Sequence, residues 1–208
     1  MSKKNLQQLV DSLSRSSKHF TKSEVECLIK LFNTLVAESR NYFAAVGFDC
    51  NVLRDVLYRM FGMMDDIMMD RVFHTFDTDN NNRISVEEWV RGLAVFLRGT
   101  LEERIKYCFD IYDLNGDGYI TRDEMFQLLK NSLLKQPLEE DPDEGIKELV
   151  DTALKKMDYD HDGKLSFVDF EKAVRNENLL LEAFGPCLPD IKSIMAFEQK
   201  TFQETCKL

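Results

Sequence analysis

Three short segments of the chain carry oxygen-bearing residues at the spacing that a calcium ion needs. Calcium is a hard cation with about six to eight oxygen ligands, and a twelve-residue loop supplies them from positions 1, 3, 5, 7, 9 and 12. Position 7 contributes its backbone carbonyl, and position 12 a carboxylate that can bind through both oxygens. The expected ligands are Asp77, Asp79, Asn81, Arg83 and Glu88 in segment 77–88; Asp113, Asn115, Asp117, Tyr119 and Glu124 in segment 113–124; and Asp158, Asp160, Asp162, Lys164 and Asp169 in segment 158–169.

Two of these loops depart from the ideal pattern. Asn82 stands at position 6 of the first loop, where the other loops have glycine for a sharp turn. Because asparagine tolerates left-handed backbone better than most residues, we expect a modest loss of affinity and not a dead site. Asp169 takes position 12 of the last loop and is one methylene shorter than glutamate. If it binds through one oxygen, coordination falls toward the octahedral geometry of magnesium, so magnesium is expected to compete most at this loop.

Each loop lies between segments whose apolar residues recur with the period of a helix. Such runs cover residues 25–37, 52–61, 66–76, 86–97, 101–112, 122–134, 144–157, 167–176 and 178–184, and strand-like alternation is nearly absent. The recurring unit of helix, acidic loop and helix is the EF-hand. Clusters of Asp, Asn and Gly also form ordinary turns. Three matches in one chain, each flanked by amphipathic helices, favour ion binding over simple turns.

EF-hands work in pairs, so three ion-binding hands predict a fourth. The residue at position 8 of each loop is apolar and is expected to join paired loops through a short antiparallel bridge: Ile84, Ile120 and Leu165. Upstream, segment 41–52 aligns Phe48 with this position but keeps few oxygens. We expect a degenerate hand there that retains the scaffold and binds no ion. The predicted fold is all-α, with paired EF-hands in two lobes.

Helix-start signals and turn residues predict how the chain is divided. Thr21 with Glu24, and Thr100 with Glu103, match the capping box that opens a helix. We expect an N-terminal helical extension at 1–19, an N-terminal lobe at 20–99, a C-terminal lobe at 100–184 and a tail at 185–208. Residues 135–145, rich in proline and acidic side chains, read as a linker between two hands.

The tail carries apolar residues within a polar helix-forming segment: Ile191, Ile194, Met195, Phe197 and Phe202. Such a segment could fill an apolar groove until a partner displaces it. The alternatives are permanent packing as core, or disorder.

The composition narrows the classes of partner and activity. The net charge of −10 argues against nucleic acid or anionic membrane as main partner and suits cations and basic peptides. Five cysteines without a CxxC pair indicate free thiols. No secretory signal, membrane span or catalytic motif is visible, so we expect a soluble cytoplasmic protein that is not an enzyme. Nine methionines and fifteen phenylalanines fit either an ordinary core or an adaptable peptide groove.

Segment 100–125, from Thr100 through the second loop to Met125, resembles the neuronal calcium sensor family. The likeness extends over about residues 20–185. Four segments resemble one branch of that family, the calcium sensors of motile cilia and flagella: 96–99, 130–137, 141–145 and 179–189. This resemblance implies a partner, the heavy chain of outer-arm dynein, and a location at the axoneme. Ser2 stands where a myristoylated sensor has glycine, so no lipid anchor is expected.

These observations predict a calcium sensor that changes conformation and regulates a protein partner. Two alternatives stay open. A calcium and magnesium buffer would change its apolar exposure little on ion binding. A constitutive regulatory subunit of an enzyme would stay with that enzyme in the presence of a chelator.

Overall fold

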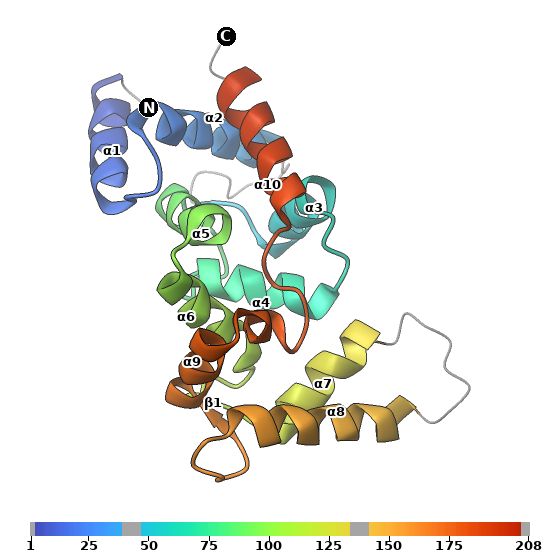
Figure 1. Cartoon of the computed structure of the whole chain (residues 1–208). Coiled ribbons are helices and arrows are strands. Elements are labelled where there is room, and N and C mark those ends of the chain that lie inside the picture. Colours follow the sequence, from blue (N-terminus) through green and yellow to red (C-terminus); the bar gives the residue numbers. More distant parts are fainter. Residues whose placement is uncertain (1–2, 39–46, 134–141, 205–208) are drawn as a thin grey trace. The chain divides into compact units, whose positions relative to one another are not determined.

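The computed structural model describes residues 3–38, 47–133 and 142–204 and has the predicted all-α architecture (Figure 1). The α-helices are α1 (Lys3–Ser16), α2 (Lys22–Glu38), α3 (Cys50–Phe61), α4 (Asp66–Phe76), α5 (Val86–Arg98), α6 (Leu101–Tyr112), α7 (Arg122–Leu133), α8 (Pro142–Met157), α9 (Phe167–Asn176) and α10 (Ile191–Glu198). Two-residue strands β1 (Tyr119–Ile120) and β2 (Leu165–Ser166), a 3₁₀ turn η1 (Asn178–Glu182) and a π-helical turn η2 (Gln199–Glu204) complete the described elements. None of the helices in this part of the chain has the length and apolar character of a membrane span.

The chain divides into two compact units. Unit 1 comprises residues 1–64, 73–99 and 189–208, and unit 2 comprises residues 65–72 and 100–188. Helix α4 is shared, because its residues 66–72 belong to unit 2 and its residues 73–76 to unit 1. Much of the predicted degenerate loop, at 41–46, and most of the predicted linker, at 135–141, fall outside the described residues.

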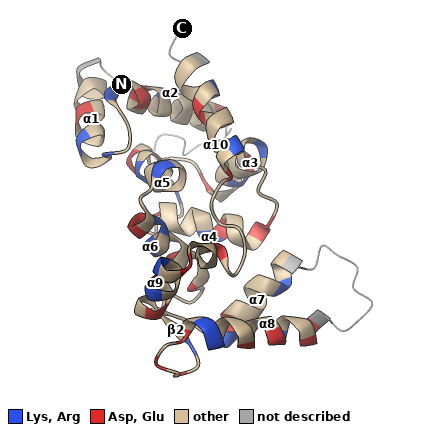
Figure 2. Cartoon of the chain, in the orientation of Figure 1, with Lys and Arg blue, Asp and Glu red and all other residues tan. Residues whose placement is uncertain are grey.

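Several helices begin with the residues that the sequence marks as caps. Thr21 and Glu24 bond reciprocally at the start of α2, and the N-cap Thr100 and Glu103 form a complete capping box on α6. Charged residues also complement the helix dipoles. Helix α8, for example, has acidic residues in its first turn and Lys155 and Lys156 in its last (Figure 2). The residues that set these helix ends are therefore close to them in the sequence.

An aromatic core holds the hand that carries loop 77–88 against its upstream neighbour in unit 1. Trp89 on α5 is fully buried, and its Nε1 donates to the Leu28 carbonyl at 3.3 Å. Its ring lies 5.4 Å from that of Phe48. Phe48 and Ile84 exchange backbone hydrogen bonds of 3.2 and 2.8 Å, which confirms the predicted pairing of these two position-8 residues. Gly47 has a φ of +146°, and a Cβ there would lie 2.3 Å from the Ile84 oxygen, so glycine permits this close approach.

The C-terminal tail packs on unit 1. Phe197 of α10 is 3% exposed, and its ring lies 5.2 Å from Phe61 of α3. Phe202 in η2 meets Phe20 with ring centroids 5.9 Å apart. Of the three possibilities for the tail, disorder is therefore wrong for residues 191–204, which are helical.

Unit 2 pairs its two hands through the β1–β2 ladder. The strands are antiparallel, with Ile120 opposite Leu165, as predicted from their place in the loops. Below the ladder, Tyr112 packs against Phe170 and Phe184, with centroids 6.1 and 5.3 Å apart. The Tyr112 hydroxyl donates to the Gly185 carbonyl at 2.6 Å, so the segment after η1 is part of this core.

The cysteines differ in part from expectation. Cys50, Cys108 and Cys187 are free thiols, whereas Cys27 is disulfide-bonded, so the expectation of free thiols is wrong for Cys27. The sulfur atoms of Cys108 and Cys187 lie 3.2 Å apart in the core of unit 2. Spacing along the chain gave no hint of either arrangement, because both depend on the tertiary fold.

The contact between α4 and α5 yields a stability prediction. A Cβ on Gly92 of α5 would lie 2.4 Å from the ring of Phe76, which is 1% exposed and has little room to move. We expect Gly92→Ala to lower the free energy of unfolding by about 1–3 kcal/mol through overpacking, despite the gain in helix propensity. Gly145→Ala on α8 is the control, since nothing lies within 4 Å of its Cβ. The free energy of unfolding of that variant should rise by up to about 1 kcal/mol. Urea unfolding of both variants measures the difference; equal effects would contradict the packing argument.

Candidate metal centres

The first aspartate of each loop is held by the loop's own backbone. Asp77, Asp113 and Asp158 are at most 7% exposed. In every loop the Oδ2 atom of this aspartate accepts the N–H of position 6, with donor–acceptor distances of 2.8 Å for Asn82, 2.8 Å for Gly118 and 2.9 Å for Gly163. The three loops therefore share one local fold despite their different sequences.

Left-handed backbone occurs at two positions of each loop. At position 6, Asn82 has a φ of +60°, close to the +86° and +87° of the corresponding glycines. The expectation that asparagine can take this conformation is confirmed. Position 4 is also left-handed, in Asn80, Gly116 and His161. This second turn was not predicted from the sequence, although asparagine and glycine at the same loop position were a usable sign of it.

The carboxylate at position 12 links the two ends of its loop. In the first loop, Glu88 Oε1 accepts the N–H groups of Thr78 at 2.8 Å and Asp79 at 3.3 Å. Its Oε2 accepts the Ser85 N–H at 2.9 Å and completes the capping box of α5. The same side chain therefore holds the start of the loop and the start of the helix that leaves it.

Glu124 repeats this arrangement in the second loop. Its Oε1 accepts from the amides of Leu114 at 2.9 Å and Asn115 at 3.1 Å. Its Oε2 accepts from both the backbone and the hydroxyl of Thr121, at 2.8 and 2.7 Å. Loop and exiting helix are again tied through one carboxylate.

Asp169 makes the same link less fully, as its shorter side chain requires. Its Oδ2 binds the Ser166 N–H at 3.2 Å and the Ser166 hydroxyl at 2.6 Å. On the loop side, Oδ1 accepts the Tyr159 N–H at 3.3 Å, one backbone bond where each glutamate has two. The missing methylene thus shortens the reach of position 12 toward the loop.

The crowded carboxylates perturb one another in the first loop. Burial raises the pKa of Asp77, and the nearby Glu88 carboxylate adds to this, against the hydrogen bonds from Asn82 and Asn81. Burial also opposes ionisation of Glu88, but hydrogen bonds from Ser85 prevail and hold its pKa below the usual value. A cation shared by these two carboxylates would favour the ionised form of both.

In the last loop, burial raises the pKa of Asp160, and the negative charges of Asp162 and Asp169 act in the same direction. Asp158 differs, because backbone N–H groups led by Gly163 lower its pKa although burial opposes them. A divalent cation would relieve the repulsion at this loop as well.

The donor atoms fit a hard cation. Carboxylate oxygens of Asp77, Asp79 and Glu88 all lie within 4.8 Å of one another, as do those of Asp158, Asp160 and Asp162. In the second loop Asn115 is turned so that its amide donates to Asp117 Oδ2 at 3.0 Å. Because all the expected ligands are oxygens, the sites suit calcium or magnesium and not a metal that prefers sulfur or imidazole.

The position-7 residues, which would offer carbonyls, are half-buried: Arg83, Tyr119 and Lys164. In unit 2 two of them meet across the paired loops, where the Lys164 ammonium lies 3.3 Å from the centre of the Tyr119 ring. This contact was not foreseen from the sequence, since it requires the register of the β1–β2 ladder.

Comparison with known proteins agrees with these features. A family model described as an EF-hand domain pair matches residues 102–175, and a model described as an EF hand matches residues 68–94. Calaxin from Xenopus laevis is 66% identical to this chain over 98% of both sequences. Calaxin from Danio rerio is 60% identical over the full length of both, and calaxin from Homo sapiens is 61% identical over 98% of this chain and 97% of its own. The chain therefore belongs to the calaxin family of EF-hand calcium-binding regulatory proteins, which are not enzymes.

Proposed function

We propose that this calcium sensor binds three ions, in the loops 77–88, 113–124 and 158–169, and thereby regulates the heavy chain of axonemal outer-arm dynein in motile cilia and flagella. The observation that supports the sensing role is the carboxylate at position 12, which joins each loop to its exiting helix. Dynein as partner is supported by the segments that resemble the sensors of motile cilia. Residues 41–52 form the degenerate hand in this proposal and contribute no ion.

The bonds of the position-12 carboxylates suggest how ion binding moves a helix. To coordinate through both oxygens, Glu124 must exchange its bonds from Leu114 and Asn115 for the ion. Because Glu124 lies in the first turn of α7, its movement carries that helix with it. Calcium supplies the charge that makes this exchange favourable, and in sensor hands the resulting change of interhelical angle exposes apolar surface. The β1–β2 ladder passes the movement to the neighbouring loop.

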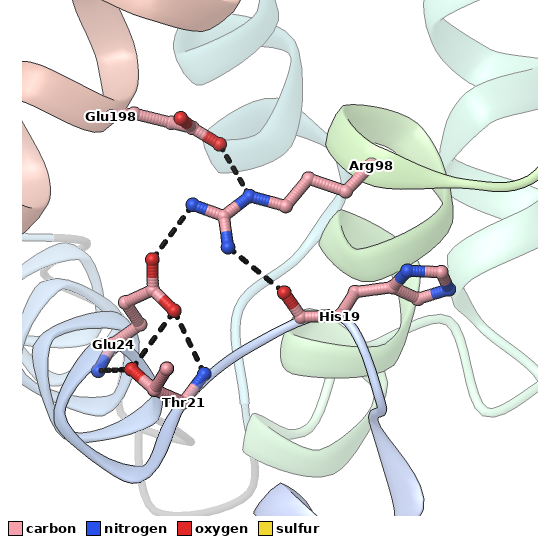
Figure 3. Close-up of polar contacts among 5 residues, drawn as sticks. All are labelled: His19, Thr21, Glu24, Arg98 and Glu198. Atoms are coloured by element: carbon pink, nitrogen blue, oxygen red, sulfur yellow. Dashed lines mark hydrogen bonds and ion pairs between the residues drawn. The ribbon is translucent and has the colours of Figure 1, made fainter.

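The tail is the segment that covers apolar surface of unit 1. At its base, Arg98 donates to Glu198 of the tail at 2.7 Å, to Glu24 of α2 at 2.7 Å and to the His19 carbonyl at 2.9 Å (Figure 3). The Arg98 guanidinium also lies over two aromatic rings, with its Cζ 5.0 Å from the centroid of Phe20 and 5.4 Å from that of Phe202. We therefore propose that the tail is a lid over the Phe61 surface and that Arg98 is its latch.

A buffer is the main alternative to this sensor, and the two differ in a measurable way. The hands of a buffer barely open on ion binding, so binding of an apolar dye would stay constant. A constitutive subunit would instead remain bound to its enzyme in chelator. An increase of dye fluorescence with calcium, together with calcium-dependent capture of dynein from ciliary extract, would support the sensor over both alternatives.

The number of ions is the first test. We expect calorimetry with saturating calcium to give three ions per chain, because three loops keep their oxygen ligands. The amides of Asn82, Gly118 and Gly163 each bond to the first aspartate of a loop, so their NMR resonances report the loops separately. Glu124→Gln should lower the calcium affinity of loop 113–124 alone, which the Gly118 amide reports. We expect a loss of about tenfold or more, a change of at least about 1.4 kcal/mol in binding free energy. Four ions would show that the upstream loop was wrongly dismissed.

Ion preference at the last loop is the second test. Asp169→Glu should raise its selectivity for calcium over magnesium, since the longer side chain can bind through both oxygens without drawing α9 inward. Competition titrations that follow the Gly163 amide measure this preference. The reverse change in the second loop, Glu124→Asp, is the matched control. It should lower the selectivity of that loop for calcium over magnesium, as followed at the Gly118 amide. Unchanged selectivity in both variants would mean that side-chain length is not the determinant.

The lid is the third test. Truncation after Pro189, or Arg98→Met, should increase binding of an apolar dye in chelator and strengthen capture of dynein at low calcium. Arg175→Met removes an equally charged side chain that pairs with Glu171 and Glu102 of unit 2, and it should change neither measurement. If truncated protein stays folded by circular dichroism and neither reading moves, the tail is permanent core and not a lid.

A further inference from the structure

Helix α6, which leads into loop 113–124, ends without a cation of its own. The last carbonyls of any helix have no partner within that helix, and a positive charge near them is favourable. Of the helices that lead into the other two loops, α8 carries Lys155 and Lys156 in its last turn, and α4 carries His74 there. The last turn of α6 has no basic residue.

Arg71 of α4 supplies the missing charge from outside the helix. Its Nε donates to the Ile111 carbonyl at 3.0 Å, and its Nη1 to the Leu114 carbonyl at 3.2 Å. Its Nη2 donates to the carbonyls of Asp110 at 2.7 Å and Asp113 at 2.5 Å. A guanidinium presents several donors in a fixed plane, so one side chain can bind four carbonyls that a lysine could not reach together.

These bonds fix the first two residues of the loop. Asp113 and Leu114 occupy positions 1 and 2, and Arg71 holds both through their carbonyls. Glu124 holds Leu114 from the other side, through its amide. Burial lowers the pKa of Arg71, while the carboxylates of Asp113, Glu124 and Asp110 oppose this effect. The start of the loop is therefore clamped between a cation and a carboxylate.

The same helix ends at the first ligand of another loop. From Arg71, α4 continues to Phe76, and the Asp77 amide still donates to the Phe73 carbonyl at 2.9 Å. The strand bridges do not provide this connection, because they pair Phe48 with Ile84 and β1 with β2. Loops 77–88 and 113–124 thus belong to different pairs, and α4 is a continuous element that holds the start of one loop through Arg71, in its middle, and leads into the other loop at its C-terminal end.

We propose that Arg71 is a positioning residue that couples these two loops, so that ion binding at 77–88 raises the calcium affinity of 113–124. An ion bound at loop 77–88 orders Asp77 and so restricts the motion of α4 and of Arg71 on it. Arg71 then holds the start of loop 113–124 in place, and this loop loses less conformational entropy when it binds its own ion. This inference rests on the proposed binding of ions by both loops. Coupling of this kind is typically about fivefold or more in affinity.

A double-mutant cycle on the full chain tests the coupling. Glu88→Gln disables the first loop, and the calcium dependence of the Gly118 amide resonance gives the affinity of the second. In the wild-type background, Glu88→Gln should lower that affinity by about fivefold. With Arg71→Met present, the same change should have no effect. A cap that only stabilised α6 would lower the affinity in Arg71→Met but leave the fivefold dependence on the first loop intact, and that result would overturn the proposal.

Two further variants separate the remaining explanations. Arg71→Lys keeps the charge and the side-chain stem but loses the fork, and should also lose the coupling; it carries the test if Arg71→Met does not fold. Arg122→Gln removes another cation near the same loop, one that pairs with Asp151 at 2.5 Å, and should keep the coupling. If the Asn82 and Gly118 resonances of the wild type ignore calcium, the ion sites themselves are wrong. If they respond independently of each other, only the coupling is wrong.

Discussion

The carboxylate at position 12 of each loop is the interaction on which the other features depend. It caps the exiting helix and at the same time accepts N–H groups from the start of the loop. The next residue along each helix is a fully buried apolar side chain: Trp89, Met125 and Phe170. A shift of the carboxylate would therefore disturb the packing of the buried residue next to it, and so the core of its unit.

The pairing of hands decides how far such a shift extends. Within unit 1, Phe48 of the Phe48–Ile84 bridge packs edge-to-face against the Trp89 ring, so loop 77–88 and its upstream neighbour share one aromatic cluster. Within unit 2, the β1–β2 ladder and the contact of Lys164 with Tyr119 join loops 113–124 and 158–169. The upstream segment thus contributes core contacts through Phe48, although the sequence of 41–52 has few oxygen ligands.

Much of the fold and the local geometry of the sites could be predicted from the sequence, because both depend on nearby residues. Helix periodicity, the capping boxes at Thr21 and Thr100, the position-8 bridges and the left-handed turn at Asn82 are all short-range features. Arg71 and Arg98 could not be assigned from the sequence. Each binds groups about 40 to 100 positions away along the chain, and an arginine on an amphipathic helix gives no sign of its distant partner.

The disulfide at Cys27 and the close thiols of Cys108 and Cys187 belong to the same class of long-range features. Cysteine spacing predicts pairing only within motifs or small disulfide frameworks, and this chain has neither. The sequence likewise did not decide the structure of the tail, because its apolar residues were compatible with packing on the protein or with disorder. The contact of Phe197 with Phe61 shows that it packs.

Asn82 also has a consequence for the denatured chain. In its left-handed turn asparagine costs up to about 1 kcal/mol of backbone strain that Gly118 and Gly163 avoid. Unfolded glycine, however, samples more conformations than asparagine, and losing that freedom costs about 0.4–1 kcal/mol on folding. The two effects are of similar size and opposite sign. Asparagine in place of glycine at this turn therefore changes the cost of ordering the first loop little, because part of the restriction is already present in the unfolded chain.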